Sequence, residues 1–437
     1  MSSEVFQPFN EISLKDATQF IVDNRGRTAP TSESGIALIA TNCVNNNDLY
    51  PTKKNLRFVS EDTYQTWFRA HPQPGDILLT NKGSQNGAVC LVPDPVDFCI
   101  AQDMVALRAD PKKISPLYLF AALRSTLIQQ RIKALNVDAV IPHLKKTDFD
   151  KLFIPLPECS MQKWIGEYYF EVSSRIELLQ KTNGTLEAIA QALFKSWFID
   201  FDPVRAKAEG RQPEGMDSVT AALFPDSFEE FEQGIAPKGW GFGELGEILS
   251  LRNERTQPSE VTKKLPYVPI ESIGSKSPFL SGYKLGDEAN SSLTLFKRGD
   301  ILFGAMRPYF HKVCIAPFDG VTRTTVFTLF SKNKKASEFA LFLAYQESTI
   351  EYATQHSEGS TIPYAKWKNS LERMPISLPP AAVQEKFSEM VSSFISRADA
   401  NNQQAHTLTK LRDTLLPRLI SGQLQIRKET QIEEACV

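Results

Sequence analysis

The chain has 437 residues, of which 42% are hydrophobic and 23% are charged, and its formal net charge at pH 7 is −2. This length exceeds what one hydrophobic core usually supports, so we expect two or more domains in an ordinary globular protein. The first residues include Glu4 and no apolar signal core, and no apolar run reaches the roughly 18 residues of a membrane span, so we predict a cytoplasmic protein. The six cysteines form no metal-binding pattern, so no structural zinc site is expected.

An internal repeat with an offset of about 222 residues organises the chain. Residues 74–79 (Pro-Gly-Asp-Ile-Leu-Leu) return as residues 298–303 (Arg-Gly-Asp-Ile-Leu-Phe), 224 positions later. The order is kept by further pairs: residues 89–93 with 313–317, Ile141-Pro142 with Ile362-Pro363, and Leu156-Pro157 with Leu378-Pro379. The nearly constant offset predicts two similar modules, and diverged copies suit a protein that reads one object at two places.

The first part of each copy, roughly residues 1–157 and 237–379, contains short apolar runs separated by Gly, Pro and Asn. Such runs are typical of strands and turns. Within these parts, residues 115–134 and 337–354 carry apolar side chains at helical spacing. We therefore predict an α+β fold for each of two similar globules.

Each copy ends in a predicted long helix of about 38 residues. Apolar residues recur there at seven-residue intervals, which indicates the seam of a coiled coil: Ile165, Val172, Leu179, Leu186 and Leu193 in the first helix, and Phe387, Phe394, Asn401, Leu408 and Leu415 in the second. We favour pairing of the two helices with each other, and the alternative is that each packs on its own globule. Asn401 would cost stability but fix the register. Gly184 favours a local break or bend.

Charge is segregated along the chain. Residues 104–151 hold 9 basic and 4 acidic side chains, giving +5, and residues 252–335 hold 14 and 7, giving +7. Residues 209–247 hold 2 and 9, giving −7. Basic segments inside both copies are compatible with contact with DNA phosphates, but solvated surfaces commonly produce such runs, so this pattern alone does not favour DNA binding.

Two similar globules joined by a stiff rod are suited to bind one face of B-DNA about one turn, roughly 34 Å, or a multiple of it apart. Since the copies differ where strands and loops are expected, we predict an asymmetric, bipartite DNA target. One alternative is a coiled-coil adaptor that binds only proteins. Another is an enzyme, such as a fragment of a fused restriction-methylation protein, which would need a catalytic domain outside these residues.

The sequence lacks the motifs of the obvious catalysts. It has no Asn/Asp-Pro-Pro-Tyr/Phe motif of an N6-adenine methyltransferase and no G-x-x-x-x-G-K-[ST] phosphate-binding loop. Asp76 and Asp300 follow a glycine at a strand start, so a turn role is favoured over a role as nuclease metal ligands. The five histidines share no spacing with carboxylates. We predict a non-catalytic protein without a metal.

Three segments resemble a known family. Residues 185–207 (Thr-Leu-Glu-Ala-Ile-Ala-Gln-Ala-Leu-Phe-Lys-Ser-Trp-Phe-Ile-Asp-Phe-Asp-Pro-Val-Arg-Ala-Lys) resemble the central conserved region of type I restriction-modification specificity subunits. Residues 408–422 resemble their C-terminal conserved region, and residues 237–240 (Pro-Lys-Gly-Trp) resemble the start of their second recognition domain. The resemblance covers nearly the whole chain.

The resemblance implies two target recognition domains, each reading one part of a split double-stranded DNA site, and an antiparallel pair of helices that spaces them. It also implies docking of two methyltransferase subunits and, with them, motor-nuclease restriction subunits. Any S-adenosylmethionine would be bound by the methyltransferase, so no cofactor is expected in this chain. The implied domains are target recognition domain 1 (1–157), the central helix (158–203), an acidic connector (204–236), target recognition domain 2 (237–380), and the C-terminal helix and tail (381–437).

The candidate DNA contacts are basic and polar residues of both copies, and several of them lie in two equivalent loops. Residues 81–87 follow the Gly-Asp-Ile strand of the first copy, and residues 306–312 hold the same place in the second. Their polar and basic side chains suit phosphates or base edges, and the alternative is a solvated hairpin loop. The candidates in the first copy are Lys53, Lys54, Arg57, Asn81, Lys82, Ser84, Gln85, Asn86, His143 and Lys145. In the second copy they are Arg252, Arg255, Lys263, Lys264, Arg307, Tyr309, His311, Arg323, Thr324, Tyr364 and Lys366.

The end of the first long helix is rich in aromatic residues. Phe194, Trp197, Phe198 and Phe201 place four aromatic side chains within eight residues. We predict a docking surface for a methyltransferase subunit there. The alternative is that these rings pack into the core of this chain, and the two roles are compatible.

Overall fold

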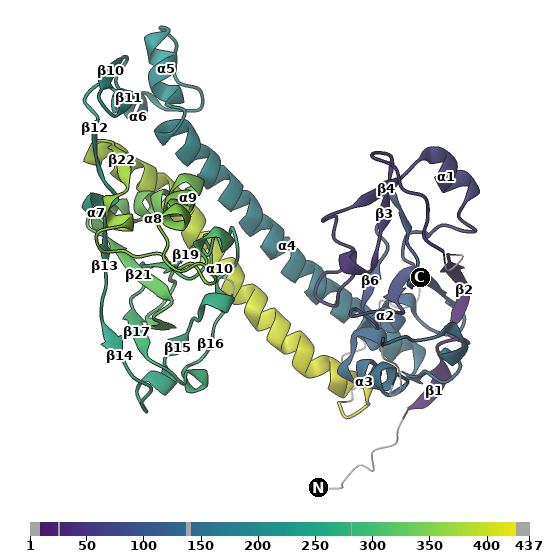
Figure 1. Ribbon diagram of the computed structural model, residues 1–437. Coiled ribbons are helices and arrows are strands. Elements are labelled where there is room, and N and C mark those ends of the chain that lie inside the picture. Colours follow the sequence, from purple (N-terminus) through teal and green to yellow (C-terminus); the bar gives the residue numbers. More distant parts are fainter. Residues whose placement is uncertain (1–8, 25–26, 137–140, 281, 425–437) are drawn as a thin grey trace. The chain divides into compact units, whose positions relative to one another are not determined.

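The computed structural model describes residues 9–24, 27–136, 141–280 and 282–424, and it divides into two compact units (Figure 1). Unit 1 comprises residues 1–178 and 407–437, and unit 2 comprises residues 179–406. The division passes through both long helices, because different halves of each helix belong to different units. The domain boundaries inferred from the sequence, which set the long helices apart from the globules, stay predictions.

Unit 1 is built on a four-stranded antiparallel sheet with the strand order β2-β8-β5-β6. Its strands are β2 (Thr18–Asp23), β5 (Ile77–Thr80), β6 (Val89–Leu91) and β8 (Met104–Ala109). A second sheet has the order β4 (Arg57–Val59), β3 (Ile36–Ile39), β7 (Phe98–Ile100), and β1 (Asn10–Ser13) pairs with β9 (Phe153–Leu156). The helices are α1 (Glu61–Thr66), α2 (Pro116–Arg124) and α3 (Thr126–Ala134), and α2 packs on the first sheet.

Unit 2 repeats this plan. Its four-stranded antiparallel sheet has the order β13 (Leu249–Leu251), β21 (Val326–Ser331), β18 (Ile301–Gly304), β19 (Val313–Ile315). A second sheet has the order β14 (Arg255–Thr256), β17 (Leu293–Phe296), β20 (Gly320–Arg323), β15 (Pro266–Tyr267), β16 (Lys284–Leu285). The hairpin β10 (Phe228–Phe231)–β11 (Gly234–Pro237) and the pair β12 (Gly241–Glu244)–β22 (Pro375–Leu378) complete the strands. The helices are α5 (Asp202–Ala208), α6 (Ser218–Ala222), α7 (Leu245–Ile248), α8 (Ser337–Tyr345) and α9 (Glu347–Gln355).

The pairing register agrees with the internal repeat. Ile77 of β5 lies opposite Leu107 and Leu91, and Ile301 of β18 lies opposite Leu329 and Ile315, which are the equivalent residues of the second copy. Each unit therefore builds its four-stranded sheet from equivalent strands in the same order. The prediction of mixed helix and sheet structure in both copies is confirmed.

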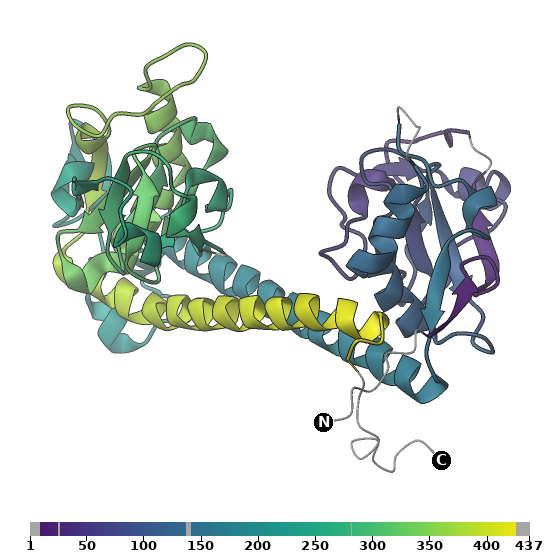
Figure 2. The same ribbon diagram turned by 90° about the horizontal axis from the view of Figure 1, so that it is seen from below.

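Two helices of 40 residues, α4 (Cys159–Phe198) and α10 (Ala381–Ile420), confirm the predicted long helices. In unit 2, the second half of α4 and the first half of α10 lie side by side (Figure 2). There, Asn183 lies against Asn401, and the ring centroids of Phe194 and Phe387 are 5.5 Å apart. In unit 1, Arg412 Nη1 donates to Ser173 Oγ at 3.4 Å. In unit 2, higher residue numbers on α4 thus meet lower residue numbers on α10, so the contacting halves of the two helices run in opposite directions.

The most buried column of these helices has the predicted seven-residue interval but lies three residues before the predicted one. It consists of Gln162, Tyr169, Ile176, Asn183, Ala190 and Trp197 on α4, and of Gln384, Val391, Ala398, Ala405, Arg412 and Leu419 on α10, none more than 8% exposed. In the predicted column, Ile165, Leu179, Phe387 and Asn401 are buried and the other six residues are half-buried. The predicted seven-residue interval is therefore correct. The predicted column is wrong by three positions, because the most buried column includes polar residues that a search for apolar repeats passes over.

Gly184 does not break the first long helix, which is continuous from Cys159 to Phe198. A Cβ atom at Gly184 would have no atom within 4 Å, so no close contact requires a glycine there. The helix accepts the cost of about 1 kcal/mol relative to alanine because tertiary contacts hold its neighbours. Among the described residues, no helix is long and apolar enough to cross a membrane.

Candidate nucleic-acid interface

Each unit presents one loop that is held by the Ile-Pro segment of the same copy. In unit 1, the β5–β6 loop (residues 81–88) receives a hydrogen bond from Leu144 N to Asn86 Oδ1 at 3.2 Å, and Gly83 N donates to Pro142 O at 3.0 Å. In unit 2, Arg307 N of the β18–β19 loop (residues 305–312) donates to Pro363 O at 2.7 Å. Within each unit, the candidate residues of the loop thus lie next to the candidates that follow the Ile-Pro pair of the same copy.

In unit 1, the exposed candidates at this place are Ser84, Gln85 and Lys145. Lys82 is half-buried, and its Nζ lies 3.9 Å from Asp103 Oδ1, while His143 pairs with it through an isolated bridge. Asn86 is half-buried and positions the loop by accepting the hydrogen bond from Leu144 N, whereas Asn81 is buried and its Oδ1 has no hydrogen-bond partner among the described residues. The usable polar groups of this face are therefore two uncharged side chains flanked by lysines.

In unit 2, candidates from three segments lie near one another. Tyr364 Oη donates to Thr324 O at 2.7 Å. Burial raises the pKa of Tyr364, and the nearby positive charge of Arg255 opposes this effect. Lys366 Nζ lies 2.6 Å from Glu358 Oε1, and Arg323 Nη2 donates to Asn290 Oδ1 at 3.2 Å. Both faces carry basic side chains, but the tyrosine is found only in unit 2, where His143 holds its place in unit 1.

Arg307 has an unused donor at this face. Its Nε is buried and has no hydrogen-bond partner among the described residues. A buried donor without a partner costs free energy, which a ligand that accepts a hydrogen bond would recover. Arg323 Nε is likewise buried without a partner among the described residues, so both arginines are candidates for contact with a bound acceptor.

Two candidates of the second copy have structural roles instead. Arg252 makes two hydrogen bonds to the buried carboxylate of Asp300, at 2.6 and 3.0 Å, so it is not free to contact DNA phosphates. His311 is 4% exposed, and its Nε2 lies 2.8 Å from Tyr345 O. The sequence assigned both to the interface because it shows their charge and spacing but not their partners.

The turn role of Asp76 and Asp300 is borne out by their contacts. Asp76 accepts hydrogen bonds from Gln73 N at 2.9 Å and from Arg108, and Asp300 accepts one from Lys297 N at 2.8 Å. Both carboxylates are buried. Within the described residues, no group of three or more His, Cys, Asp or Glu side chains is placed to hold a metal ion.

The remaining candidates lie on other elements. Lys53, Lys54 and Arg57 belong to the β4 side of the three-stranded sheet, where Lys53 forms an ion pair with Asp97. Lys263 and Lys264 lie in a short 3-10 helix, Thr262–Lys264, and Lys263 pairs with Glu260 at 2.7 Å. Exposed cations of this kind suit long-range attraction of phosphates rather than the reading of bases.

The aromatic end of α4 packs into unit 2. Phe194, Trp197 and Phe198 are at most 7% exposed and contact Phe387, while Phe201 packs on Trp240. The first three rings are therefore not available as a docking surface. For them the alternative interpretation holds, in which the rings pack into the core of this chain. The sequence missed that α8 and α10 supply enough apolar surface to bury them.

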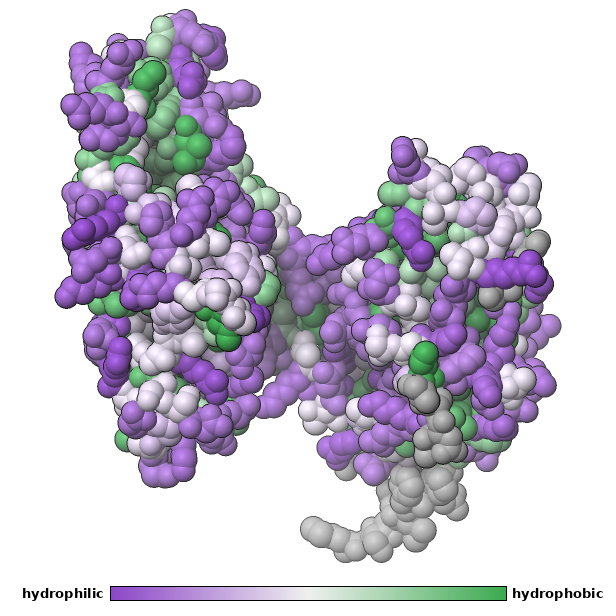
Figure 3. Space-filling model, viewed as in Figure 1, coloured by the Kyte–Doolittle hydropathy of each residue, from purple (hydrophilic) through white to green (hydrophobic). Residues whose placement is uncertain are grey.

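Exposed apolar side chains lie close to this core instead. Figure 3 shows hydrophobic side chains gathered over the region of α5, α6 and the β10–β11 hairpin. The exposed members are Ile199, Val219 and Ile235. Beside them, a cavity of about 540 Å³ is lined by Trp197, Arg205, Met216 and Met390, among others. This surface, rather than the buried rings, is suited to contact another protein.

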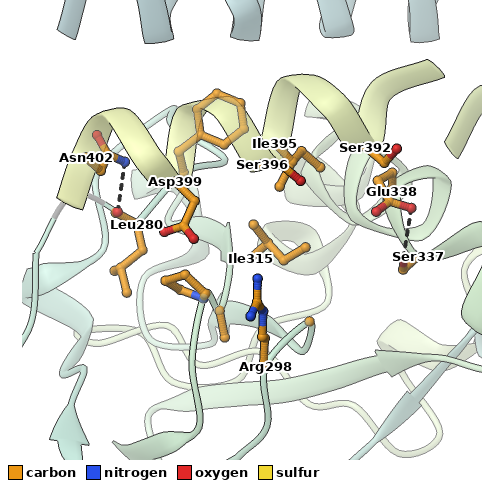
Figure 4. Close-up of a pocket in the computed structure, with 14 residues that line it drawn as sticks. Leu280, Arg298, Ile315, Ser337, Glu338, Ser392, Ile395, Ser396, Asp399 and Asn402 are labelled. Carbon is orange, nitrogen blue, oxygen red and sulfur yellow. Dashed lines mark hydrogen bonds between the residues drawn. The ribbon is translucent and has the colours of Figure 1, made fainter. Parts of the chain in front are cut away.

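A smaller cavity of about 180 Å³ lies where α10 rests on the globule of unit 2 (Figure 4). It contains Arg298, Glu338 and Ser392, and Asp399 of α10 points toward Arg298 in Figure 4. The equivalent positions of unit 1 hold Pro74, Pro116 and Phe170. Polar residues thus stand in the second copy where the first has two prolines and a phenylalanine, and no residue of the β18–β19 loop is among those lining the cavity.

Comparison with known proteins connects this arrangement to a family. The model of the type I restriction modification DNA specificity domain matches residues 28–188 and 237–410, which are the two copies of the repeat. The MjaIX specificity subunit of Methanocaldococcus jannaschii is 27% identical over 371 residues, 81% of this chain and 78% of that protein. The HindI specificity subunit of Haemophilus influenzae is 25% identical over 409 residues, 80% of this chain and 86% of that protein.

A solved structure shares the fold. The type I restriction-modification system S subunit from M. genitalium superposes with a TM-score of 0.58 at 17% identity, covering 98% of each chain. Since the family model matches most of the chain in two segments, the chain belongs to the type I restriction modification DNA specificity family. The resemblance inferred from residues 185–207 and 408–422 is confirmed.

Proposed function

We propose that this chain is the DNA specificity subunit of a type I restriction-modification complex and reads an asymmetric, bipartite target. The observation that carries the proposal is the loop held by an Ile-Pro segment in both units. The backbone frame is the same, but the exposed side chains differ: Ser84 and Gln85 in unit 1, Tyr309 and Phe310 in unit 2. Equal frames with unequal side chains suit two half-sites of different sequence.

The long helices are proposed to act as a spacer. A helix of 40 residues is about 60 Å long at 1.5 Å per residue, which exceeds the length that one small globule needs. The seven-residue burial interval and the opposite running directions support an antiparallel coiled coil. Such a pair would fix the gap between the two half-sites, as helical scaffolds of defined length do.

The chemistry is proposed to reside in partner subunits. Two adenine methyltransferase subunits would dock on this chain, one of them on the surface of Ile199, Val219 and Ile235, and restriction subunits would join through them. S-adenosylmethionine would be bound by the methyltransferase and not by this chain. The chain itself would be non-catalytic, a proposal supported by the lack of methyltransferase and phosphate-loop motifs in its sequence.

The salt dependence of DNA binding by the complex with a cognate methyltransferase tests this proposal. We expect Lys145→Ala and Arg255→Ala each to weaken binding and to reduce the slope of log K against log salt by about 1, because one phosphate contact is lost. Lys113→Ala is a matched control, since Lys113 follows β8 at the end opposite the β5–β6 loop. If all three variants bind DNA like the wild type, the loop faces do not contact DNA.

A further inference from the structure

The β5–β6 and β18–β19 loops share a backbone conformation that suits glycine in one copy and strains the residues of the other. In unit 1, Gly83 and Gly87 have φ angles of 91° and 88°. The residues 224 positions later, Arg307 and His311, have φ angles of 51° and 50°. A positive φ costs glycine nothing but brings the Cβ of other residues close to the backbone. Unit 2 therefore keeps the same loop shape at an energetic cost that unit 1 avoids.

The contacts of unit 2 hold this strained loop in place. His311 is buried, with Nε2 against Tyr345 O and Nδ1 3.3 Å from Glu347 Oε2. Ser275 Oγ donates to Phe310 O at 2.6 Å, and Lys276 N donates to His311 O at 2.8 Å. Strain that the surroundings stabilise in this way is concentrated at functional sites. The loop is therefore a rigid support for its tip.

The tip presents two neighbouring aromatic side chains. Tyr309 is 48% exposed and Phe310 is 45% exposed, and their ring centroids are 4.8 Å apart. The equivalent residues of unit 1 are Gln85 and Asn86, so the loop shape does not require aromatic residues. Exposing two such rings side by side disfavours solubility unless a ligand covers them. The unpaired Nε of Arg307 and the cation of Arg255 belong to the same face and favour a polyanion as that ligand.

We propose that Tyr309 and Phe310 form an aromatic wedge that stacks on bases of the half-site bound by unit 2 and partly unstacks one base step. The equivalent loop of unit 1 would contact its half-site with polar groups and leave the bases stacked. This inference rests on the proposed DNA-binding function. Aromatic side chains stack on bases whatever their identity, and apolar wedges between base steps deform the duplex, so half-site 2 would be selected partly by its ease of deformation.

Fluorescence of 2-aminopurine tests the wedge in the complex of the full chain with its methyltransferase. The probe replaces one base at a time in both half-sites, except the adenine that becomes methylated. We expect fluorescence to rise on binding at one step of one half-site only. The double variant Tyr309→Gln/Phe310→Asn, which carries the residues of unit 1, should abolish this rise and weaken binding on the order of tenfold or more. The conservative variant Tyr309→Phe/Phe310→Tyr should retain both.

The outcomes separate the wedge from the DNA-binding function. If the Gln/Asn variant binds within twofold of the wild type with the same fluorescence, the wedge is wrong. If that holds while Lys145→Ala and Arg255→Ala still weaken binding, the proposed function stands alone. If the Gln/Asn variant loses the methyltransferase but the remaining chain keeps its DNA affinity, the rings contact protein and the wedge is again wrong. If the wild-type complex does not bind DNA, both proposals fail.

Discussion

The side-chain amide of Asn401 on α10 donates a hydrogen bond of 2.8 Å to Oδ1 of Asn183 on α4, and both residues are buried. Asn183 in turn donates to Ala398 O at 3.1 Å and to Asn402 Oδ1 at 2.7 Å. The repeat maps this pair onto Ala405 and Leu179, which are buried and apolar. The polar pair therefore occurs at one of two equivalent places and distinguishes the halves of an otherwise similar helix pair.

We predict that Asn401→Leu lowers the free energy of unfolding by about 1–3 kcal/mol, because it leaves the buried Oδ1 of Asn183 without its donor. The double variant Asn183→Ala/Asn401→Leu copies the apolar pair and should recover most of this loss. Urea unfolding of the four members of the double-mutant cycle measures the coupling. Additive losses in the cycle would show that the two amides do not act as a pair.

A second prediction concerns the buried pair of Arg252 and Asp300. Arg252→Leu should lower the free energy of unfolding by about 3–5 kcal/mol, because the carboxylate of Asp300 would stay buried without its partner. Asp300→Asn combined with Arg252→Leu should lose less than Arg252→Leu alone. Hydrogen exchange of the β18 amides reports the change within unit 2, and Arg255→Ala is the control from an exposed arginine.

The pH dependence of the unfolding free energy should show the titration of Glu187. Burial raises the pKa of Glu187 above its ordinary value, although hydrogen bonds from Tyr345 and Gln191 oppose the shift. The folded state then holds this proton more tightly than the unfolded state, so the contribution of Glu187 is most favourable at acidic pH. It is lost as the pH rises from the ordinary pKa of the carboxyl group through its raised folded-state pKa.

We therefore expect Glu187→Gln to remove part of the loss of stability between acidic and neutral pH, since the amide keeps an acceptor for Tyr345. Thermal unfolding at a series of pH values measures the effect against the wild type. A variant whose stability falls as steeply as that of the wild type would show that Glu187 is not the responsible group.

Substitutions of Arg307 should separate the effect of its strained backbone on stability from the effect of its side chain on DNA binding. Arg307→Gly relieves a left-handed conformation that costs about 1–2 kcal/mol, of which the greater flexibility of glycine offsets about 0.5–1 kcal/mol. We expect an unfolding free energy equal to or slightly above that of the wild type, together with DNA binding weakened about tenfold. Arg307→Ala keeps the strain and should lose affinity equally without gaining stability. Equal affinity of the glycine variant and the wild type would contradict a role in DNA contact.

The sequence predicted the features that recur along the chain. The repeat offset and the seven-residue interval placed both long helices, and the repeat aligned the two loops with each other and the two Ile-Pro segments with each other. That each loop contacts the Ile-Pro segment of its own copy was not predicted. The conserved-region likeness at residues 185–207 identified the family. These features are local or periodic, so they can be read without knowing which distant residues meet.

The sequence could not show contacts that the repeat does not share. Asp76 pairs with Arg108 of β8, whereas Asp300 pairs with Arg252, which follows β13 and is not the counterpart of Arg108. The two arginines lie over Phe20 and Phe330 respectively, so arginine and phenylalanine have exchanged strands between the copies. The two left-handed positions of the β18–β19 loop could have been predicted, because Arg307 and His311 align with Gly83 and Gly87 in the repeat.

The most direct test of the account is the adenine methylation of a methylation-free host genome when this chain is expressed with its cognate methyltransferase, compared with the methyltransferase alone. We predict a split, asymmetric sequence motif only when both proteins are present, with one adenine methylated in each half. The Tyr309→Gln/Phe310→Asn variant should relax or abolish the motif in one half. A complex that forms but methylates no motif, or a motif produced by the methyltransferase without this chain, would contradict the role of this chain in DNA specificity.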